Sequence, residues 1–240
     1  MDAILSPAWE LSLLGFWQLT RTGVPVDVGA RQQRLIAALA LLGPRSRQFI
    51  AGLLWPDSPE AQAAGSLRTS LFRISHQLPL LLHCTPASLS LADGVRVDFR
   101  EVRQLIASVQ NGHAQPPEHS IDVLQAADLL PGWYEDWVMF EQERLQLLRL
   151  DALETMAARF LDAGDVPRAI EAARVAASIE PLRESAQQLL ARSHLRAGNQ
   201  AAAIRSFQQF RLRLQRELGV APSRSFADLL NVPSSAAPAQ

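Results

Sequence analysis

The sequence predicts a mainly α-helical protein with a small β component, divided into two domains. Three observations support this fold class. The chain has 240 residues, of which 48% are hydrophobic, so each half can bury a core. A period of 34 residues recurs in the second half, where helical patterns dominate. The first half instead contains short strand patterns on either side of three helical patterns.

The first predicted elements form a small antiparallel sheet. Residues 11–15 and 16–20 read as strands, a turn follows at residues 21–23, and residues 24–28 read as a third strand. Pro25 limits this third strand to a sheet edge or a strand start, because proline cannot donate a ladder hydrogen bond.

Three helices are predicted after the sheet. Apolar residues recur at helical spacing, which predicts helices at residues 30–42, 46–54 and about 60–78. The third helix ends before Pro79 and is expected to bury Leu67, Leu71, Ile74 and Leu78.

The rest of the first half predicts a hairpin and a closing helix. Residues 80–83 and 88–91 read as paired strands, residues 95–99 as a further strand, and residues 100–109 as a helix. A sheet, three helices and a hairpin in this order predict a winged helix-turn-helix domain.

The third helix of such a domain supplies candidate DNA contacts. It enters the major groove, while the hairpin contacts the DNA backbone. The face opposite the apolar stripe carries the residues expected to meet bases, which are Arg68, Thr69, Phe72, Arg73 and His76. Three arginines near helix starts are expected to contact phosphates: Arg31, Arg45 and Arg47. Two alternatives are open: Phe72 equally suits a subunit or inter-domain contact, and the whole face suits a solvated surface.

The second half contains a repeated helix–turn–helix unit. Residues 157–170 match residues 191–204 at an offset of 34. The matched pairs include turn glycines, helix N-caps and small packing residues, namely Gly164 with Gly198, Asp165 with Asn199, and Ala169 with Ala203. This pattern resembles tetratricopeptide repeats, and the alternative is two unrelated amphipathic hairpins.

The stretch before the repeats is expected to complete their core. It predicts a short helix, a break at Pro131-Gly132 and a long helix from about residue 137 to 161. Trp133, Trp137 and Phe140 are spaced to share one helical face. We expect these aromatic residues to pack in the core, with ligand stacking as the alternative.

The order of motifs resembles the antibiotic regulatory protein (SARP-like) family of actinobacteria. The resemblance is carried by residues 130–137, 141–145, 165–177, 180–184 and 217–223, and more weakly by residues 53–57 and 66–74. Such proteins combine an OmpR-like winged helix with a bacterial transcriptional activator domain. The resemblance implies promoter binding, recruitment of RNA polymerase, and oligomer or partner contacts through the helical repeats.

This sequence departs from the family pattern in its basic residues. Family members carry several of them late in the third helix and in the hairpin, where this chain has Ser75, His76, Thr85, Ser88 and Ser90. We therefore hold two functional hypotheses. The first is a transcriptional regulator, an activator in particular, that binds promoter DNA. The second is a protein-interaction module whose winged helix has lost tight DNA binding.

The predicted domain boundaries follow from these patterns. We expect a winged-helix domain at residues 1–110, a linker at 111–120, a repeat domain at 121–230 and a disordered tail at 231–240.

The net charge is −1, with a net of +2 over residues 1–110 and −3 over the rest. This small difference indicates neither function by itself.

Enzyme and metal chemistry find little support in the sequence. Neither GxxxxGK[ST] nor GxGxxG occurs, and Asp27, Asp57 and Asp98 lack a paired spacing. His113 and His119 have no further ligand nearby in sequence, so we expect no metal, no cofactor and no catalysis. We expect Cys84 to be a buried, inert thiol.

The expected location is the cytoplasm. A single cysteine excludes a disulfide framework, and the first residues lack the positive region of a signal peptide. The longest apolar runs, residues 35–42 and 78–82, are too short to cross a bilayer.

Overall fold

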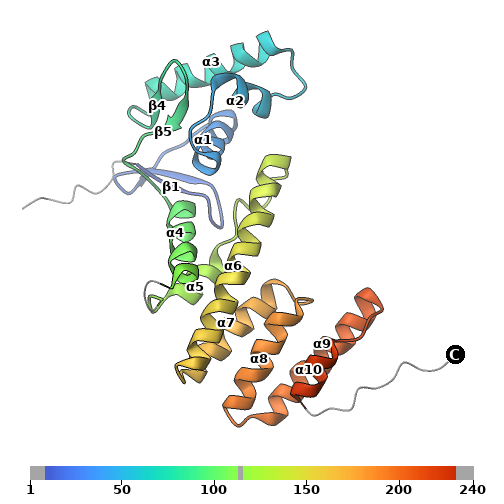
Figure 1. The fold of residues 1–240 in the computed structure, drawn as a ribbon. Coiled ribbons are helices and arrows are strands. Elements are labelled where there is room, and N and C mark those ends of the chain that lie inside the picture. Colours follow the sequence, from blue (N-terminus) through green and yellow to red (C-terminus); the bar gives the residue numbers. More distant parts are fainter. Residues whose placement is uncertain (1–8, 113–115, 231–240) are drawn as a thin grey trace, which may run out of the picture. The chain divides into compact units, whose positions relative to one another are not determined.

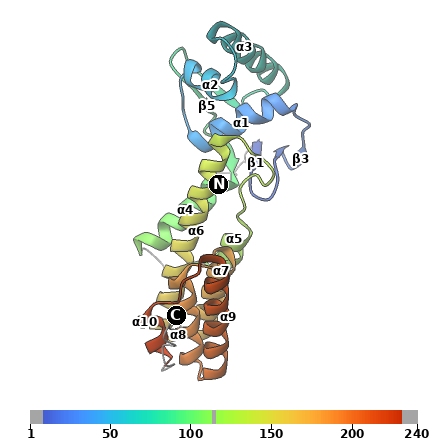
Figure 2. The ribbon, with the colours of Figure 1, turned by 90° about the vertical axis from the view of Figure 1, so that its right-hand side faces the viewer.

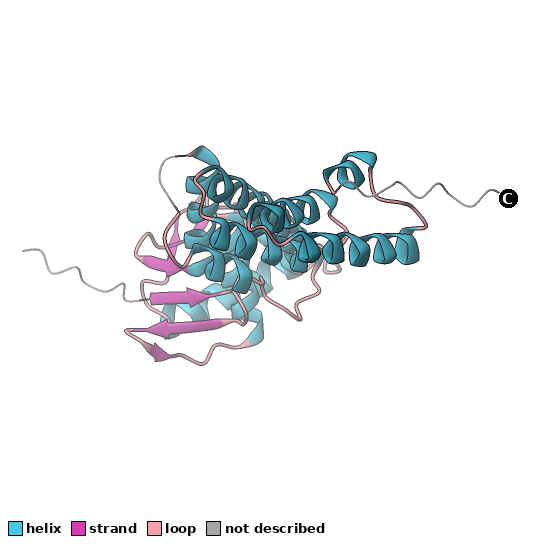
Figure 3. Ribbon diagram, turned by 90° about the horizontal axis from the view of Figure 1, so that it is seen from below, coloured by secondary structure: helices cyan, strands magenta, loops and turns pink. Residues whose placement is uncertain are grey.

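The computed structural model describes residues 9–112 and 116–230, and its first elements form a four-stranded sheet. Strand β1 (Trp9–Ser12) pairs antiparallel with β2 (Gln18–Arg21), and β2 pairs with β3 (Val24–Pro25). Strand β6 (Val95–Val97) lies parallel to β1, which gives the order β3-β2-β1-β6. Figure 3 shows these strands in magenta. Pro25 is on the edge strand, as predicted.

The first two strands are displaced from their predicted positions. Gly15 has a positive φ of 80°, and its amide donates to the Asp128 carbonyl at 2.7 Å. The Leu13 carbonyl accepts from Leu130 N at 2.8 Å. The backbone after β1 is therefore hydrogen-bonded to a segment remote in sequence, so β1 ends at Ser12 and β2 begins only at Gln18.

Three helices and a hairpin complete the winged-helix order. The helices are α1 (Ala30–Leu42), α2 (Arg47–Leu54) and α3 (Glu60–Gln77), and the hairpin pairs β4 (Leu82–Cys84) with β5 (Leu89–Leu91). Ser46 caps α2 by accepting from Phe49 N at 3.2 Å. The predicted mainly helical fold with a winged-helix order is confirmed.

Seven helices follow the hairpin and β6 in the part of the chain that the structure describes (Figure 1). The first is α4 (Asp98–Asn111), which starts directly after β6. The other six are α5 (Ser120–Ala126), α6 (Asp136–Asp162), α7 (Val166–Ile179), α8 (Glu184–Arg196), α9 (Gln200–Leu218) and the short α10 (Arg224–Leu229). Helices α7, α8 and α9 lie side by side in both Figure 1 and Figure 2, and α8 packs against both neighbours.

The predicted repeat is present with its turns and caps. Gly164 and Gly198 have positive φ values of 79° and 72°, a conformation in which a side chain would be strained. Asp165 caps α7 by accepting from Arg168 N at 3.3 Å, and Asn199 caps α9 by accepting from Ala202 N at 3.1 Å. The small residues Ala169 and Ala203 are fully buried, which lets the paired helices approach closely.

The chain divides into two compact units that interleave along the sequence. The N-terminal unit comprises the residues up to Arg103 together with Ala126–Arg144, and the C-terminal unit comprises Gln104–Gln125 together with the residues from Leu145 onward. The predicted tail at 231–240 and His113 lie outside the described residues. The described part of the predicted linker belongs to the C-terminal unit.

Two packing predictions are wrong. Phe140 is 71% exposed and Trp133 precedes α6, so of the three aromatic residues only Trp137 is buried in the core. Cys84 is exposed rather than buried, because it ends a short strand whose last two residues both face outward. Among the described residues, no helix is long and apolar enough to cross a membrane.

Candidate nucleic-acid interface

The outward face of α3 carries every residue that the sequence assigned to base contacts. Helix α3 buries Ala63, Leu67, Ser70 and Ile74, while Leu71 is half-buried. The predicted contact residues Arg68, Thr69, Phe72, Arg73 and His76 are all exposed. Phe72 is 63% exposed, which leaves an aromatic ring on the surface of this helix.

Several polar groups on this face bond to their own helix. The Thr69 hydroxyl donates to Gly65 O at 3.1 Å, and the Ser75 hydroxyl donates to Phe72 O at 2.8 Å. His76 stacks on Phe72 with ring centroids 4.1 Å apart, and its Nδ1 lies 2.9 Å from Phe72 O. Arg68 and Arg73 are therefore the permanently charged groups that this face offers to a ligand.

Arg73 shares a cavity with one predicted phosphate contact. The cavity has a volume of about 340 Å³ and is lined by Arg73 from α3 and by Arg31 from the first turn of α1. Gly29 caps α1 without a side-chain hydrogen bond. Uncapped amide groups at a helix start can bind a phosphate together with a nearby arginine.

The other two predicted phosphate contacts lie at the hairpin. The backbone of Arg45 pairs with Leu89 of β5, and its guanidinium lies over Phe49, 5.6 Å from the ring centroid. Arg47 donates to the carbonyl oxygens of Thr85 and Pro86 in the hairpin turn. Arg47 thus ties α2 to the hairpin and still has N–H groups that are free for a further acceptor.

A carboxylate holds the sheet to the helix that follows it. Asp98 at the start of α4 accepts from Leu13 N at 2.9 Å, from Leu14 N at 3.0 Å and from Phe99 N at 2.7 Å. Desolvation raises the pKa of Asp98, and these three backbone hydrogen bonds oppose the rise. No sequence pattern singles out this residue, which links the end of β1 to the start of α4 by hydrogen bonds.

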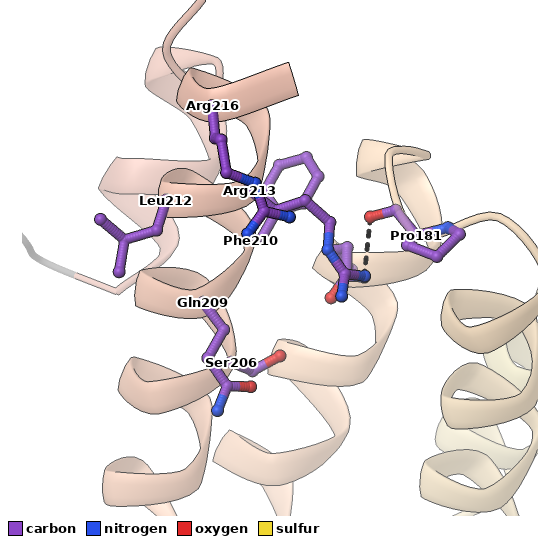
Figure 4. A pocket seen from close by; sticks show the side chains of 8 residues that line it. Pro181, Ser206, Gln209, Phe210, Leu212, Arg213 and Arg216 are labelled. Carbon is purple, nitrogen blue, oxygen red and sulfur yellow. Dashed lines mark hydrogen bonds between the residues drawn. The ribbon is translucent and has the colours of Figure 1, made fainter. Parts of the chain in front are cut away.

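The C-terminal unit contains a groove that the sequence did not indicate. Its volume is about 700 Å³, and Ser206, Gln209, Arg213 and Arg216 from α9 face Pro181 across it (Figure 4). Glu217 pairs with both arginines, at 2.8 Å from Arg216 and 3.8 Å from Arg213. The groove therefore combines amide, hydroxyl and partly neutralised guanidinium groups.

Charge is segregated within the C-terminal half rather than between the two halves. Residues 118–184 contain 14 acidic residues and 6 arginines, whereas residues 185–225 contain 7 arginines and one acidic residue, Glu217. On α8, burial and the neighbouring Arg205 and Arg174 lower the pKa of His194. Counting charges for each helix pair would have revealed this basic α8–α9 segment from the sequence.

Comparison with known proteins places these features in a family. The family described as "Bacterial transcriptional activator domain" matches residues 97–231, which is more than half of the chain. Regulatory protein AfsR of Streptomyces coelicolor is 29% identical over 239 residues, which cover 93% of this chain and 24% of AfsR. Regulatory protein AfsR of Streptomyces griseus is 27% identical over 92% of this chain and 24% of its own length. The chain thus spans about a quarter of the length of these relatives.

A solved structure shares the fold. Mycobacterium tuberculosis EmbR, determined in complex with a low affinity phosphopeptide, superimposes with a TM-score of 0.67 over 93% of this chain and 64% of EmbR. Its sequence identity is 20%, so the likeness concerns the fold alone. The chain belongs to the bacterial transcriptional activator domain family and has the SARP-like combination of a winged helix with tetratricopeptide-like repeats.

Proposed function

We propose that the chain is a transcriptional activator that binds promoter DNA through α3 and contacts RNA polymerase or another protein through its helical repeats. The observation that carries the DNA-binding part is the outward face of α3, where Arg68, Phe72 and Arg73 are all exposed. Arginine reads guanine by bidentate hydrogen bonds in the major groove, and an apolar ring can contact a thymine methyl group.

The phosphate contacts are proposed at two places that flank this face. Arg31 lines the same cavity as Arg73, so a phosphate bound at the start of α1 would lie beside the base-reading helix. Arg45 and Arg47 lie at the hairpin, where winged-helix domains contact the DNA backbone. Each such contact is expected to add to the salt dependence of binding.

A direct experiment measures binding to the DNA upstream of the gene for this protein. Fluorescence anisotropy would compare this DNA with a scrambled duplex of equal composition, at about 50 and about 200 mM salt. We expect tighter binding to the upstream DNA at both salt concentrations, and weaker binding to both duplexes at the higher one. Equal and feeble binding to both duplexes would overturn the proposal.

A second candidate is an interaction module that does not bind DNA tightly. It is favoured by the bonding of Thr69, Ser75 and His76 to their own helix, which leaves two arginines on the α3 face. The groove on α9 and the basic α8–α9 segment supply a surface for a partner protein. A homo-oligomer formed through the repeats is a further proposal of the same kind.

A binding assay with purified RNA polymerase separates the two candidates. The Arg68→Ala/Arg73→Ala double variant removes both charges of the α3 face and leaves residues 150–218 unchanged. If the chain is an adaptor, the double variant retains its partner and its cellular effect. If the chain acts through DNA, the variant retains polymerase binding but loses activation of a promoter reporter.

A further inference from the structure

A second cavity of the N-terminal unit lies between α2 and α3. Its volume is about 510 Å³, within the range of roughly 300–1,000 Å³ that small-molecule sites occupy. Ala51, Ala63, Leu67 and Leu71 give it an apolar floor, and Trp55 adds an aromatic wall. Ala51, Ala63 and Leu67 are buried, so the floor belongs to the core of the unit rather than to its surface.

Gly52 of α2 is one of the residues that line this cavity. It lies in the interior of α2, where a glycine costs about 1 kcal/mol relative to alanine. Its φ is not in the left-handed region, and a Cβ added to it meets nothing within 4 Å among the described residues. Neither the backbone nor a close neighbour therefore requires a glycine at this exposed position, which lines the cavity.

The rim of the cavity carries an excess of positive charge. Arg47 and Arg68 line it together with a single carboxylate, Glu60. Glu60 accepts a hydrogen bond from Gln48 Nε2 at 3.1 Å, whereas among the described residues Arg47 donates to neutral carbonyl oxygens of the hairpin turn. Arg68 has no ion-pair partner among the residues that the structure describes. An apolar cavity with two such arginines at its rim suits an apolar body that ends in an anionic group.

We propose that this cavity binds a small amphipathic organic anion, with its ring or branched chain between α2 and α3 and its carboxylate or sulfonate at Arg47 and Arg68. The same two arginines connect the cavity to the DNA-facing surfaces. Arg47 holds the hairpin turn, and Arg68 lies on the outward face of α3. A bound anion would compete for both guanidinium groups and so weaken DNA binding. Ligand binding stands by itself, and only this coupling rests on the proposed function.

The test uses the full chain and the fluorescent probe 1-anilinonaphthalene-8-sulfonate, an aromatic body with one anionic group. We expect saturable binding of one probe per chain. The neutral analogue N-phenyl-1-naphthylamine, which lacks the sulfonate, is expected to bind at least tenfold more weakly. Arg68→Met should remove most of this difference, because it keeps a long side chain and deletes the charge.

Filling the cavity provides the decisive variant. Gly52→Leu adds a side chain at a position that lines the cavity and is expected to weaken probe binding at least tenfold without lowering the melting temperature. Ala64→Leu fills the cavity from α3 and serves as a second variant if the first does not fold. Ala61→Leu is the matched control, because this exposed residue of α3 does not line the cavity.

The outcomes separate the two proposals. Probe binding that is unchanged in the folded Gly52→Leu and Ala64→Leu variants would overturn the ligand site. Equal affinity for the charged and neutral probes would overturn the assignment of an anion. Saturating probe should weaken binding to upstream DNA in the wild type but not in Gly52→Leu. Failure of all DNA binding would contradict the proposed function and leave the probe titrations interpretable.

Discussion

At the scale of single residues, Asp98 shows how one side chain secures the winged-helix sheet. Its carboxylate accepts hydrogen bonds from the backbone of Leu13 and Leu14, at the point where β1 ends, and from its own neighbour Phe99. Without the carboxylate, these backbone N–H groups would be buried without a hydrogen-bond acceptor, which costs about 1–3 kcal/mol for each group.

The stability contributed by Asp98 should depend on pH. Its folded pKa is raised by desolvation, so the folded state binds a proton more readily than the unfolded state. The contribution of this group is therefore fully present below the unfolded pKa and is lost as the pH rises through the folded pKa. We expect the stability of the wild type relative to Asp98→Asn to decrease between about pH 3.9, the unfolded value, and neutral pH. Urea unfolding of both proteins across this interval checks the sign, and a difference that grows with pH would contradict it.

Individual contacts were the part that the sequence predicted least well. The exposed arginines of α3 follow from helical periodicity, because the buried and exposed faces are fixed by 3.6 residues per turn. No periodic signal places Arg47 against the hairpin turn, and Phe140 lies on the surface although its spacing from Trp137 predicted a shared buried face. Gly52 had a signal, since it is a glycine inside a predicted helix without a capping role.

At the scale of elements, a short last helix closes the repeat core. Phe226 of α10 is 0% exposed and packs edge-on against Phe207 of α9, with ring centroids 4.9 Å apart. The ring centroid of Phe210, which is also on α9, lies 5.8 Å from that of Phe226. The six residues of α10 thus cover the apolar face of α9 that a third repeat would otherwise bury.

Removing this aromatic contact should therefore unfold the end of the repeat. Phe226→Ala is expected to cost about 3–5 kcal/mol, as is usual for a fully buried phenylalanine. Phe140→Ala is the matched control, because Phe140 is 71% exposed, and its cost should stay within about 0.5 kcal/mol. Equal losses for the two variants in urea unfolding would show that α10 does not close the core.

The elements themselves were predictable where their signals were local. Caps and turn glycines fixed the ends of α7 and α9, because Asp165, Asn199, Gly164 and Gly198 act on backbone groups close in sequence. The first strands were misplaced because hydrogen bonds to residues 128–130 set where they end. No local sequence pattern predicts that these residues lie next to the strands.

At the scale of the whole molecule, the two units share the chain in an interleaved order. Residues 126–144 belong to the N-terminal unit, although they follow a segment of the C-terminal unit. Leu130 N bonds Leu13 O at 2.8 Å, and Arg34 pairs with Glu135 at 2.9 Å. Leu129 and Leu130 are both buried. The predicted winged-helix domain at residues 1–110 lacks all of these contacts.

Truncation tests how far this domain is self-contained. Two buried leucines contribute about 1.5–3 kcal/mol each, and about 1 kcal/mol in stability shifts the melting temperature of a small domain by about 4–8 °C. We therefore expect a fragment of residues 1–144 to melt more than about 10 °C above a fragment of residues 1–110. A fragment of residues 1–125 should resemble the shorter one. Equal melting temperatures for all three fragments would support the boundary at residue 110 and contradict the role of residues 126–144.

If α3 reads promoter DNA, as we propose, an Arg73→Ala variant should lose sequence specificity. The measurement is the ratio of affinities for upstream and scrambled DNA at one salt concentration. We expect Arg73→Ala to lower the affinity for upstream DNA by about 1–3 kcal/mol and to reduce this ratio. Arg144→Ala, which removes an equal charge from α6, should leave the ratio unchanged. An unchanged ratio in Arg73→Ala would contradict the claim.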